Sequence, residues 1–367
     1  MVGCEAEIDL AAIGHNVSAL RRLRAAEVMA VVKADGYGHG LVPVARAALA
    51  GGATWLGTAY LPEALALRAA GITAPVLCWL PRPGEDLAPA VRAGVDVSVS
   101  DRWVLDELLA AARRTGRAAR VHLKVDTGCA RAGATPARWP ELVLAAGKSA
   151  GDELDVVGVW SHLANADQPG HPSTDRQVAL FAEALEVAAA HGITPRLRHL
   201  ANSAAALSVP AAAYDLVRPG IAIYGVNPLP GPSPVDLVPA MTLRAPVMLA
   251  RQVAAGTPVS YGHEYVTTRE TTLALVAAGY ADGVPRAAGN RAEVLLAGRR
   301  RRISGRVCMD QFVLDVPDAP VLAGDPVVLF GPGTGGEPTL VELAEAVGTI
   351  PNELLTRLGP RVRRVYR

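Results

Sequence analysis

The stretch Val31-Val32-Lys33-Ala34-Asp35-Gly36-Tyr37-Gly38-His39-Gly40 joins a buried strand to a glycine-rich turn through a lysine. The apolar run Val28–Val32 predicts the strand, and three glycines within Lys33–Gly40 predict a sharp turn whose backbone can approach a ligand closely. An amine at the mouth of a buried strand is poorly solvated, which lowers its pKa and frees the lone pair to attack a carbonyl. We therefore expect Lys33 to be a nucleophile; the alternative is a lysine that merely caps the strand.

Lysine is scarce in this chain, which makes its presence at position 33 informative. Among the 36 lysine and arginine residues the lysines are Lys33, Lys124 and Lys148. An arginine at position 33 would supply the same charge but could not form a Schiff base with a carbonyl compound. The residue type therefore favours amine chemistry over a purely electrostatic role.

A repeated strand–helix pattern extends from this stretch to about residue 224. Eight apolar, strand-like runs occur, and most gaps between them carry an amphipathic pattern rich in Ala and Leu. The runs are Val28–Val32, Trp55–Ala59, Val76–Leu80, Val95–Val99, Val121–Val125, Val156–Trp160, Leu197–Leu200 and Leu216–Tyr224. Eight such alternations are typical of a (β/α)₈ TIM-type barrel, with a doubly wound sheet as the competing interpretation.

A barrel of this class carries its chemistry at the carboxyl ends of the strands. The ends of the predicted strands hold a polar, basic set of residues with few acids, unlike the Ala and Leu of the strand starts. The set comprises Lys33, Trp79, Asp126, Arg131, His162, His199, Asn202, Ser203, Arg218 and Gly220. We therefore expect the active site at this end of the barrel.

The helical pattern stops at the proline-rich stretch Asn227-Pro-Leu-Pro-Gly-Pro-Ser-Pro, which predicts a domain boundary. Short strands with Gly, Pro and Asp turns follow, including Arg302–Val307, then one helix at Glu337–Gly348 and a cationic strand at Arg361–Tyr366. The sequence thus predicts a barrel at residues 9–230 and a mostly β domain at residues 231–367, which residues 1–8 could join.

Composition excludes several classes of protein. Half of the 367 residues are hydrophobic and the net charge is +1, which argues against a general nucleic-acid surface. Four cysteines without a CxxC pair fit reduced thiols and no zinc or other metal site. The first residues lack the features of a signal peptide, and no apolar run approaches the ~18 residues of a membrane span. We expect a cytoplasmic protein with no membrane partner.

Eight short polar motifs interrupt the otherwise simple sequence. They are Lys33-Ala-Asp-Gly-Tyr-Gly-His-Gly40, Lys124-Val-Asp-Thr-Gly-Cys-Ala-Arg131, Ser161-His162, His199-Leu-Ala-Asn-Ser203, Arg218-Pro-Gly-Ile221, Val259-Ser-Tyr261-Gly262, Gly279-Tyr280-Ala-Asp282-Gly283 and Gly305-Arg-Val-Cys-Met-Asp310. In this order and spacing they closely resemble the alanine racemase family, which are pyridoxal 5'-phosphate (PLP) enzymes of fold type III. The resemblance runs from about Glu7 to Tyr366. It implies interconversion of L-alanine and D-alanine, supplying D-alanine for peptidoglycan.

The resemblance also implies which residues bind and act. Lys33 and Tyr261 are the two bases, since racemisation removes a proton from one face of Cα and returns it to the other. Arg218, oriented by His199, faces the pyridine nitrogen, where a guanidinium cannot accept the proton that a carboxylate would hold there. The implied cofactor-binding residues are Lys33, Tyr37, Trp79, Arg131, His162, His199, Asn202, Ser203, Arg218, Gly220 and Ile221.

Further roles concern the substrate and the assembly. Arg131, Met309 and Asp310 are implied to bind a small amino-acid substrate, and Lys124 matches a lysine that carries a carbamate in some family members. The implied entrance residues are Tyr280, Arg286, Arg306 and Asn352. Family members form homodimers in which Tyr261 and the Cys308–Asp310 loop reach the partner's site, so the resemblance implies composite active sites.

The sequence departs from the family pattern at two positions, and three alternatives to a dedicated alanine racemase can be compared with it. Asn352 stands where the family usually has a tyrosine, so broader specificity, for example for serine, in a specialised pathway is an alternative. Trp79 stands where the family usually has an aliphatic residue, and it could refill the space that Asn352 leaves, in which case the specificity for alanine is unchanged. A fold-type III amino-acid decarboxylase should carry an acid at the pyridine nitrogen and a Gly-rich phosphate loop, which this chain lacks. A non-catalytic PLP-binding protein would be a bare barrel, without the second domain that carries Tyr261.

Overall fold

The computed structural model describes residues 3–367, which divide into two compact units. The barrel unit comprises Ile13–Gly36 and Leu41–Leu237. The β unit comprises Tyr37–Gly40 and Val238–Arg367, together with the N-terminal residues up to Ala12. Each unit is described by itself below.

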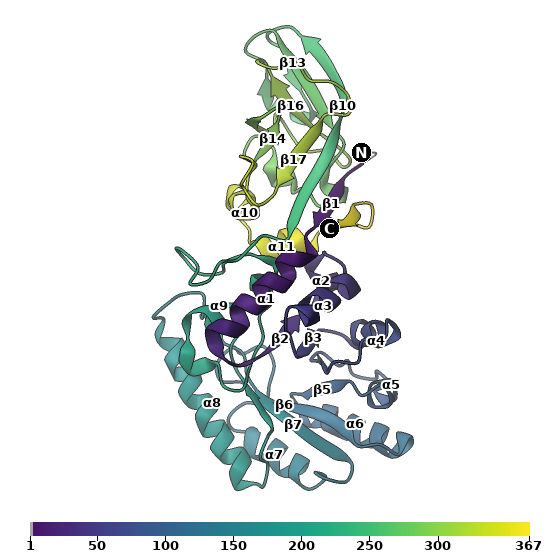
Figure 1. The fold of residues 1–367 in the computed structure, drawn as a ribbon, viewed down its shortest axis with the longest axis vertical. Coiled ribbons are helices and arrows are strands. Elements are labelled where there is room, and N and C mark those ends of the chain that lie inside the picture. Colours follow the sequence, from purple (N-terminus) through teal and green to yellow (C-terminus); the bar gives the residue numbers. More distant parts are fainter. Residues whose placement is uncertain (1–2) are drawn as a thin grey trace. The chain divides into compact units, whose positions relative to one another are not determined.

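The barrel unit contains eight parallel strands around one axis (Figure 1). They are β2 (Glu27–Val31), β3 (Trp55–Thr58), β4 (Val76–Cys78), β5 (Asp96–Val99), β6 (Ala119–Lys124), β7 (Leu154–Trp160), β8 (Leu197–His199) and β9 (Leu216–Val217). From β2 to β8 each strand pairs with the next one in sequence, and β9 pairs with β2. Strands β8 and β9 form no ladder, but backbone hydrogen bonds from Asp215 N–H to Arg198 O (3.1 Å) and from Arg218 N–H to Ala201 O (2.9 Å) connect their segments. The predicted (β/α)₈ barrel is confirmed.

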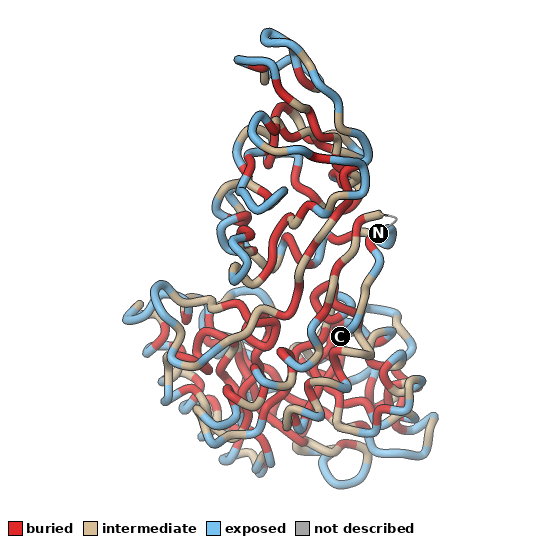
Figure 2. Tube along the Cα trace, turned by 45° about the horizontal axis from the view of Figure 1, so that its top comes forward, coloured by how far each residue is buried: buried red, intermediate tan, exposed pale blue. Residues whose placement is uncertain are grey.

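Helices lie outside the strands and cover them. They are α1 (Leu10–Arg24), which begins in the β unit, α3 (Leu41–Ala50), α4 (Leu61–Ala69), α5 (Ala88–Arg92), α6 (Arg102–Thr115), α7 (Trp139–Gly147), α8 (Pro172–Ala190), α9 (Ser203–Ser208) and the 3₁₀ turns η1 (Pro210–Ala212) and η2 (Ile221–Tyr224). Helix α6 shows why they form: Asp101 caps its first turn, an apolar face is buried, and Gly116 ends it in a left-handed conformation (φ 65°). The strands β3, β4 and β5 are buried along their whole length (Figure 2).

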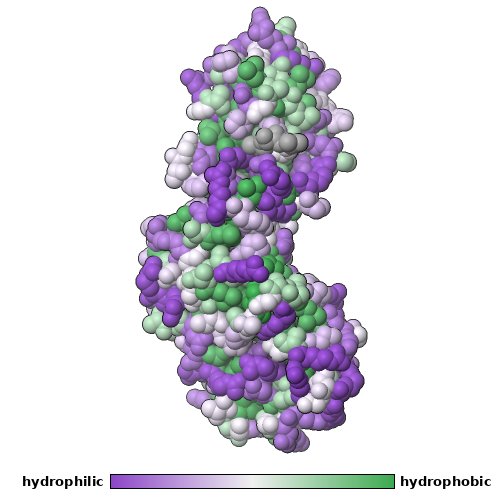
Figure 3. Space-filling view, turned by 45° about the vertical axis from the view of Figure 1, so that its right-hand side comes forward, coloured by the Kyte–Doolittle hydropathy of each residue, from purple (hydrophilic) through white to green (hydrophobic). Residues whose placement is uncertain are grey.

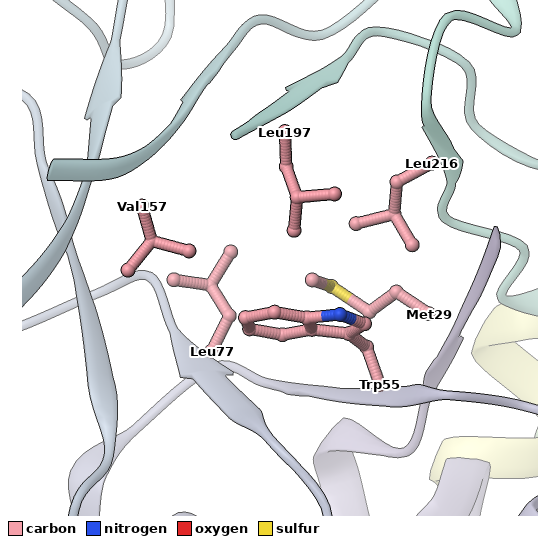
Figure 4. Close-up of a cluster of buried hydrophobic side chains, with 6 residues drawn as sticks. All are labelled: Met29, Trp55, Leu77, Val157, Leu197 and Leu216. Carbon is pink, nitrogen blue, oxygen red and sulfur yellow. The ribbon is translucent and has the colours of Figure 1, made fainter. Parts of the chain in front are cut away.

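Apolar side chains fill one part of the barrel interior. Six strands each contribute one residue to a cluster whose side chains point toward one another (Figure 4). They are Met29, Trp55, Leu77, Val157, Leu197 and Leu216, with Trp79 packed against them. Strands β5 and β6 contribute none of these six; their buried residues include Asp96, Ser98 and His122. The interior is therefore apolar on one side and polar on the other.

The β unit is built on an eight-stranded sheet. Its strands are β1 (Glu5–Ile8), β10 (Met241–Val253), β13 (Thr271–Val276), β14 (Glu293–Leu296), β15 (Arg299–Arg302), β16 (Phe312–Val316), β17 (Pro326–Phe330) and β18 (Arg363–Tyr366), and β11 (Pro258–Val259) pairs separately with β12 (Tyr265–Val266). Strand β1 lies between β10 and β18, so the first strand of the chain belongs to this sheet (Figure 1).

Three predicted elements differ from the structure. The run Leu216–Tyr224 is not one strand, because β9 ends before Pro219-Gly220 and η2 follows. Strand β15 lies at Arg299–Arg302 rather than at Arg302–Val307, since Gly305 turns the chain with φ 79°. The single predicted helix at Glu337–Gly348 is α10 (Leu340–Val347), ended by Gly348, and a second helix, α11 (Pro351–Thr356), starts on a proline.

Two features are absent from residues 3–367. None of the helices found there is long and apolar enough to cross a membrane. No group of three or more His, Cys, Asp or Glu side chains in the same residues is placed to hold a metal ion. Hydrophobic and hydrophilic residues are interspersed over the face shown in Figure 3.

Candidate active site

Lys33 follows β2 at the carboxyl end of the barrel, on a turn with unusual backbone geometry. Residues Ala34, Asp35 and Gly36 have φ of 53°, 54° and 60°, so the segment labelled α2 (Lys33–Tyr37) is a left-handed turn. Such a conformation costs free energy for non-glycine residues and requires outside support. The Ala34 N–H donates to the Glu63 carboxylate (2.6 Å), which also accepts from the N–H groups of Ala59 (2.9 Å) and Tyr60 (3.1 Å).

The surroundings of Lys33 favour its neutral amine. Burial lowers the pKa of Lys33, the positive charge of Arg131 lowers it further, and Glu63 opposes both. Its Nζ lies 5.9 Å from the centroid of the Trp79 ring. A half-buried amine whose pKa is lowered loses its proton more readily than an exposed one, and the neutral amine can act as a nucleophile and as a base.

Arg218 is a buried cation held by five neighbours, one of which is His162, whose Nδ1 lies 3.4 Å from Arg218 Nη2. Its Nη2 donates to the carbonyl oxygens of Ser161 (2.7 Å) and Leu200 (3.2 Å), and its Nη1 donates to His199 Nδ1 (3.2 Å). Its Cζ lies 4.7 Å from the Trp160 ring centroid. Burial lowers the pKa of Arg218 to about 9, which leaves the guanidinium protonated at neutral pH.

Lys124 and His162 lie in the same electropositive region. Burial, then Arg218, then Arg131 lower the pKa of Lys124 to about 8, and its Nζ lies 4.3 Å from the Trp160 ring centroid. Burial and four cations, Arg218 foremost, hold the pKa of His162 well below its usual value, so this imidazole is neutral. So many cations with so few acids favour an anionic ligand.

Hydroxyl and amide groups meet where β8 and β9 end. The Ser203 hydroxyl accepts from the N–H groups of Gly220 (2.8 Å) and Ala222 (3.3 Å). Asn202 caps α9 by accepting from Ala205 N–H (3.0 Å). Sequence reasoning missed Tyr224, whose hydroxyl donates to Val31 O (3.0 Å) and ties η2 to the strand before Lys33.

Tyr37 and Tyr261 belong to the β unit. Tyr37 is buried, which raises the pKa of its phenol to about 12. Tyr261 is 72% exposed and follows Ser260, whose φ is 60°. The Ser260 hydroxyl donates to Arg306 O (2.8 Å), so the turn that carries Tyr261 is fixed against the loop that leads to Met309.

A second set of predicted residues gathers beside that loop. Tyr280 N–H donates to Cys308 O (3.0 Å) and Ala281 N–H donates to Met309 O (2.9 Å), which joins two of the sequence motifs. A Cβ at Gly279 would lie 2.2 Å from Met309 O, so this close approach requires glycine. Met309 and Asp310 are exposed beside Tyr280.

Arg361 is the site residue that sequence reasoning missed in this unit. It donates to Asp310 (2.8 Å) and makes two bonds to the buried Asp282 (3.1 and 3.0 Å). The sequence marks Arg361 only as one of several arginines in the cationic C-terminal segment. Of the other entrance residues, Arg306 pairs with Glu264 while Arg286 is exposed nearby, and Asn352 is half-buried on α11.

Family models match both halves of the chain. The description "Alanine racemase, N-terminal domain" matches residues 8–228, and "Alanine racemase, C-terminal domain" matches residues 240–366. A curated alanine racemase from Frankia casuarinae is 60% identical over 366 residues, which cover 98% of this chain and 95% of the relative.

Solved structures agree. The alanine racemase from a D-cycloserine-producing Streptomyces lavendulae has a TM-score of 0.98 and 52% identity, covering 100% of this chain and 97% of that one. The alanine racemase from Bartonella henselae, described with covalently bound pyridoxal phosphate, has a TM-score of 0.90 and 30% identity over all of both chains.

Proposed function

This chain belongs to the alanine racemase family of amino-acid isomerases, and from that premise we propose that it interconverts L-alanine and D-alanine with PLP and two bases, Lys33 and Tyr261. The observation that supports the proposal most is that a lysine with a lowered pKa and a buried arginine lie at the same electropositive barrel mouth.

The residues of the barrel mouth fit this cofactor. When bound, PLP supplies a carbonyl that condenses with amines and a ring that stabilises a carbanion. Lys33 would hold it through its amine, while Ser203 and the amides of Gly220 and Ile221, with Tyr37, would hold the phosphate. The neutral imidazole of His162, the Asn202 cap and the Trp79 ring would complete the walls.

Arg218 distinguishes racemisation from the reactions of related barrels. It would donate a hydrogen bond to the pyridine nitrogen, because a guanidinium with its proton in place has no acceptor to offer. PLP held in this way would supply a weaker electron sink than it would with a protonated ring nitrogen, and this would limit proton transfer to carbons other than the substrate Cα. A decarboxylase of this fold would need a carboxylate there instead.

Two groups on opposite faces of the substrate Cα would remove and return its proton. Lys33 Nζ removes or returns it on one face, and the Tyr261 phenol oxygen does so on the other. Arg131 and the backbone near Met309 and Asp310 would hold the substrate carboxylate. Carbamate formation at Lys124 would replace a poorly placed cation with an anion between Arg131 and Arg218.

We further propose a cytoplasmic homodimer with shared sites that supplies D-alanine for peptidoglycan. The barrel at residues 9–230 would bind the cofactor, and residues 231–367 would supply Tyr261, Tyr280, Arg286, Arg306 and Asn352 near the substrate.

The direct test is exchange of the Cα hydrogen in D₂O with each L-amino acid, in which alanine should exchange fastest.

Borohydride reduction should fix the cofactor on Lys33, and label on Lys124 or Lys148 would contradict this assignment. In single-turnover experiments Tyr261→Phe should suppress proton removal from L-alanine far more than from D-alanine. Equal loss in both directions would contradict two separate bases.

A further inference from the structure

A line of buried hydrogen bonds runs from Arg218 through the barrel interior. Arg218 Nη1 contacts His199 Nδ1 (3.2 Å), His199 Nε2 contacts His122 Nδ1 (2.8 Å), and His122 Nε2 contacts Asp96 Oδ2 (3.1 Å). His199, His122 and Asp96 have no exposed surface, and Arg218 is 5% exposed. This chain of four side chains, called the relay below, joins the carboxyl end of β9 to the start of β5.

The donors and acceptors of the relay allow one arrangement of protons. A guanidinium can donate but not accept, so His199 Nδ1 must be the acceptor. A neutral His199 then carries its proton on Nε2 and donates to His122 Nδ1. His122 in turn carries its proton on Nε2 and donates to Asp96. Burial, then Arg218, keep the pKa of His199 well below its usual value, in agreement with a neutral ring.

We propose that Asp96 and His122 are positioning residues, which fix the tautomer of His199 and thereby hold the Arg218 guanidinium in its donating orientation. This inference rests on the proposed function, in which Arg218 faces the pyridine nitrogen. Without the carboxylate, His199 could carry its proton on Nδ1, directed at the N–H groups of Arg218, and the guanidinium would have to move.

The barrel is shaped to hold the two imidazoles. His122 is paired with Gly158 in the register of β6 and β7, and a Cβ at Gly158 would lie 2.5 Å from His122 Nδ1. The rings of Trp55 and His122 form a T-shaped pair with their centroids 5.3 Å apart. Trp160 stacks on His199, with centroids 5.6 Å apart and an angle of 6° between the ring planes. Both rings are therefore clamped in the plane that the hydrogen bonds require.

Arg120 anchors the far end. Its Nε and Nη2 donate to the two Asp96 oxygens (2.7 and 3.2 Å), and its Nη1 donates to Asp155 (3.2 Å). Arg120 thus compensates a buried carboxylate that would otherwise be costly. Both oxygens of Asp96 accept hydrogen bonds, from Arg120 and His122. Asparagine would replace one of these oxygens with an NH₂ donor that faces another donor, so Asp96→Asn should disrupt the relay without changing the side-chain volume.

The first test is nitrogen NMR of histidine side chains in the cofactor-loaded protein. His199 should show a neutral ring protonated on Nε2 at every pH from 5.5 to 9. His122 should carry a proton on Nε2 and accept a hydrogen bond at Nδ1, and the signals of both rings should change in Asp96→Asn. Gly158→Ala should change the same two signals by displacing His122 while leaving every charge in place. A His199 that carries its proton on Nδ1, or that titrates in this range, would overturn the proposal.

The second test links the relay to Arg218. Asp96→Asn and Gly158→Ala should raise the fraction of turnovers that end in transamination and lower kcat by about 10–100-fold, as when an outer hydrogen-bond partner of a metal ligand is removed. KM should change less. Asp155→Asn is the control, because Asp155 is a partner of the same Arg120 but lies outside the relay. It should leave kcat, the transamination fraction and the NMR signals unchanged. If Asp155→Asn changes them as much as Asp96→Asn does, the proposal is overturned.

The relay and the proposed function predict different observations. If the protein racemises alanine but the histidine signals contradict the predicted tautomers, the relay is wrong and the proposed function stands. If no amino acid is racemised, the proposed function fails, while the tautomers still report on the relay.

Discussion

Lys124 sets the charge balance of the barrel mouth, because its amine lies among cations with little access to water. Burial and its two arginine neighbours lower its pKa from 10.5 to about 8. Between these two pH values the unfolded chain binds the proton and the folded chain does not. Stability therefore rises with pH through this window and is lost as pH falls through about 8.

We predict that, in carbonate-free buffer without cofactor, the unmodified protein gains up to about 3 kcal/mol relative to Lys124→Met between pH 8 and 10.5, at ~1.4 kcal/mol per pKa unit. Urea unfolding across this range measures the difference. Lys148→Met, which replaces an exposed lysine, is the control for a change in net charge. If the difference between the unmodified protein and Lys124→Met does not change with pH, the amine of Lys124 titrates as in the unfolded chain.

Asn352 marks a departure from the family pattern, with a shorter side chain on α11 than the usual tyrosine. Asn352→Tyr should tighten PLP binding by roughly 1.5–3 kcal/mol, the value of a hydrogen bond to a charged group, and less if a water already bridges. It should also raise the ratio of kcat/KM for alanine to that for serine. If neither quantity changes by more than about twofold, ~0.4 kcal/mol, position 352 is neutral.

Individual site residues differ in how far the sequence reveals them. Lys33 is recognisable because its residue type is rare and it ends an apolar run. Asp96 and Arg361 are not, since one lies inside the apolar run Val95–Val99 and the other in a cationic tail. Their partners His122 and Asp310 lie 26 and 51 positions away, and pairings at such distances depend on the register of the barrel and the sheet.

The turn that carries Lys33 depends on helix α4 for its stability. Glu63, in the first turn of α4, accepts three backbone N–H groups, one of them from the strained Ala34. Glu63→Gln leaves the size unchanged but replaces one acceptor oxygen with a donor. We predict a loss of about 1–2 kcal/mol in unfolding free energy, because charged acceptors of backbone N–H groups are worth more than neutral ones.

The same variant should change the reactivity of Lys33, since Glu63 both supports the turn and opposes the lowering of the lysine pKa. We expect Lys33 to be labelled by an amine reagent at a lower pH than in the unmodified protein without cofactor. Glu342 is a matched control, because it completes a capping box on α10 in the β unit. Glu342→Gln should lose stability with unchanged Lys33 labelling; a change in both variants would argue against a specific role.

The elements were predictable where one physical pattern dominates. Strand–helix alternation located all eight barrel strands, because buried parallel strands read as continuous apolar runs. Prediction failed at Leu216–Tyr224, where both β9 and the 3₁₀ turn η2 are buried, so apolar content alone does not separate them. It failed at Arg302–Val307 because a run of arginines hides the hairpin that pairs β14 with β15.

The whole chain exposes apolar side chains that a solitary protein would be expected to bury. Tyr261 is 72% exposed, Met309 54% and Met248 53%, all within the β unit. Tyr261 and Met309 lie on segments joined by the Ser260–Arg306 hydrogen bond, and exposed apolar side chains that lie together are typical of surfaces that bind a partner. We infer that a second copy of the chain covers part of this surface, with Tyr261 entering the partner's site.

Complementation of inactive variants tests this assembly. Lys33→Ala removes the base from the barrel unit, and Tyr261→Phe removes the base from the β unit. If each site combines the barrel of one chain with Tyr261 of the other, a mixed dimer contains one intact site and one site with both changes. In a two-fold dimer with full exchange, half of the dimers are mixed, so activity should recover to about a quarter of the unmodified value.

Native mass spectrometry must first show that subunits have exchanged, and each variant incubated with itself is the control. Absence of recovery in exchanged dimers would mean that both bases of a site come from one chain, and that the exposed tyrosine reaches Lys33 of its own subunit or serves another purpose.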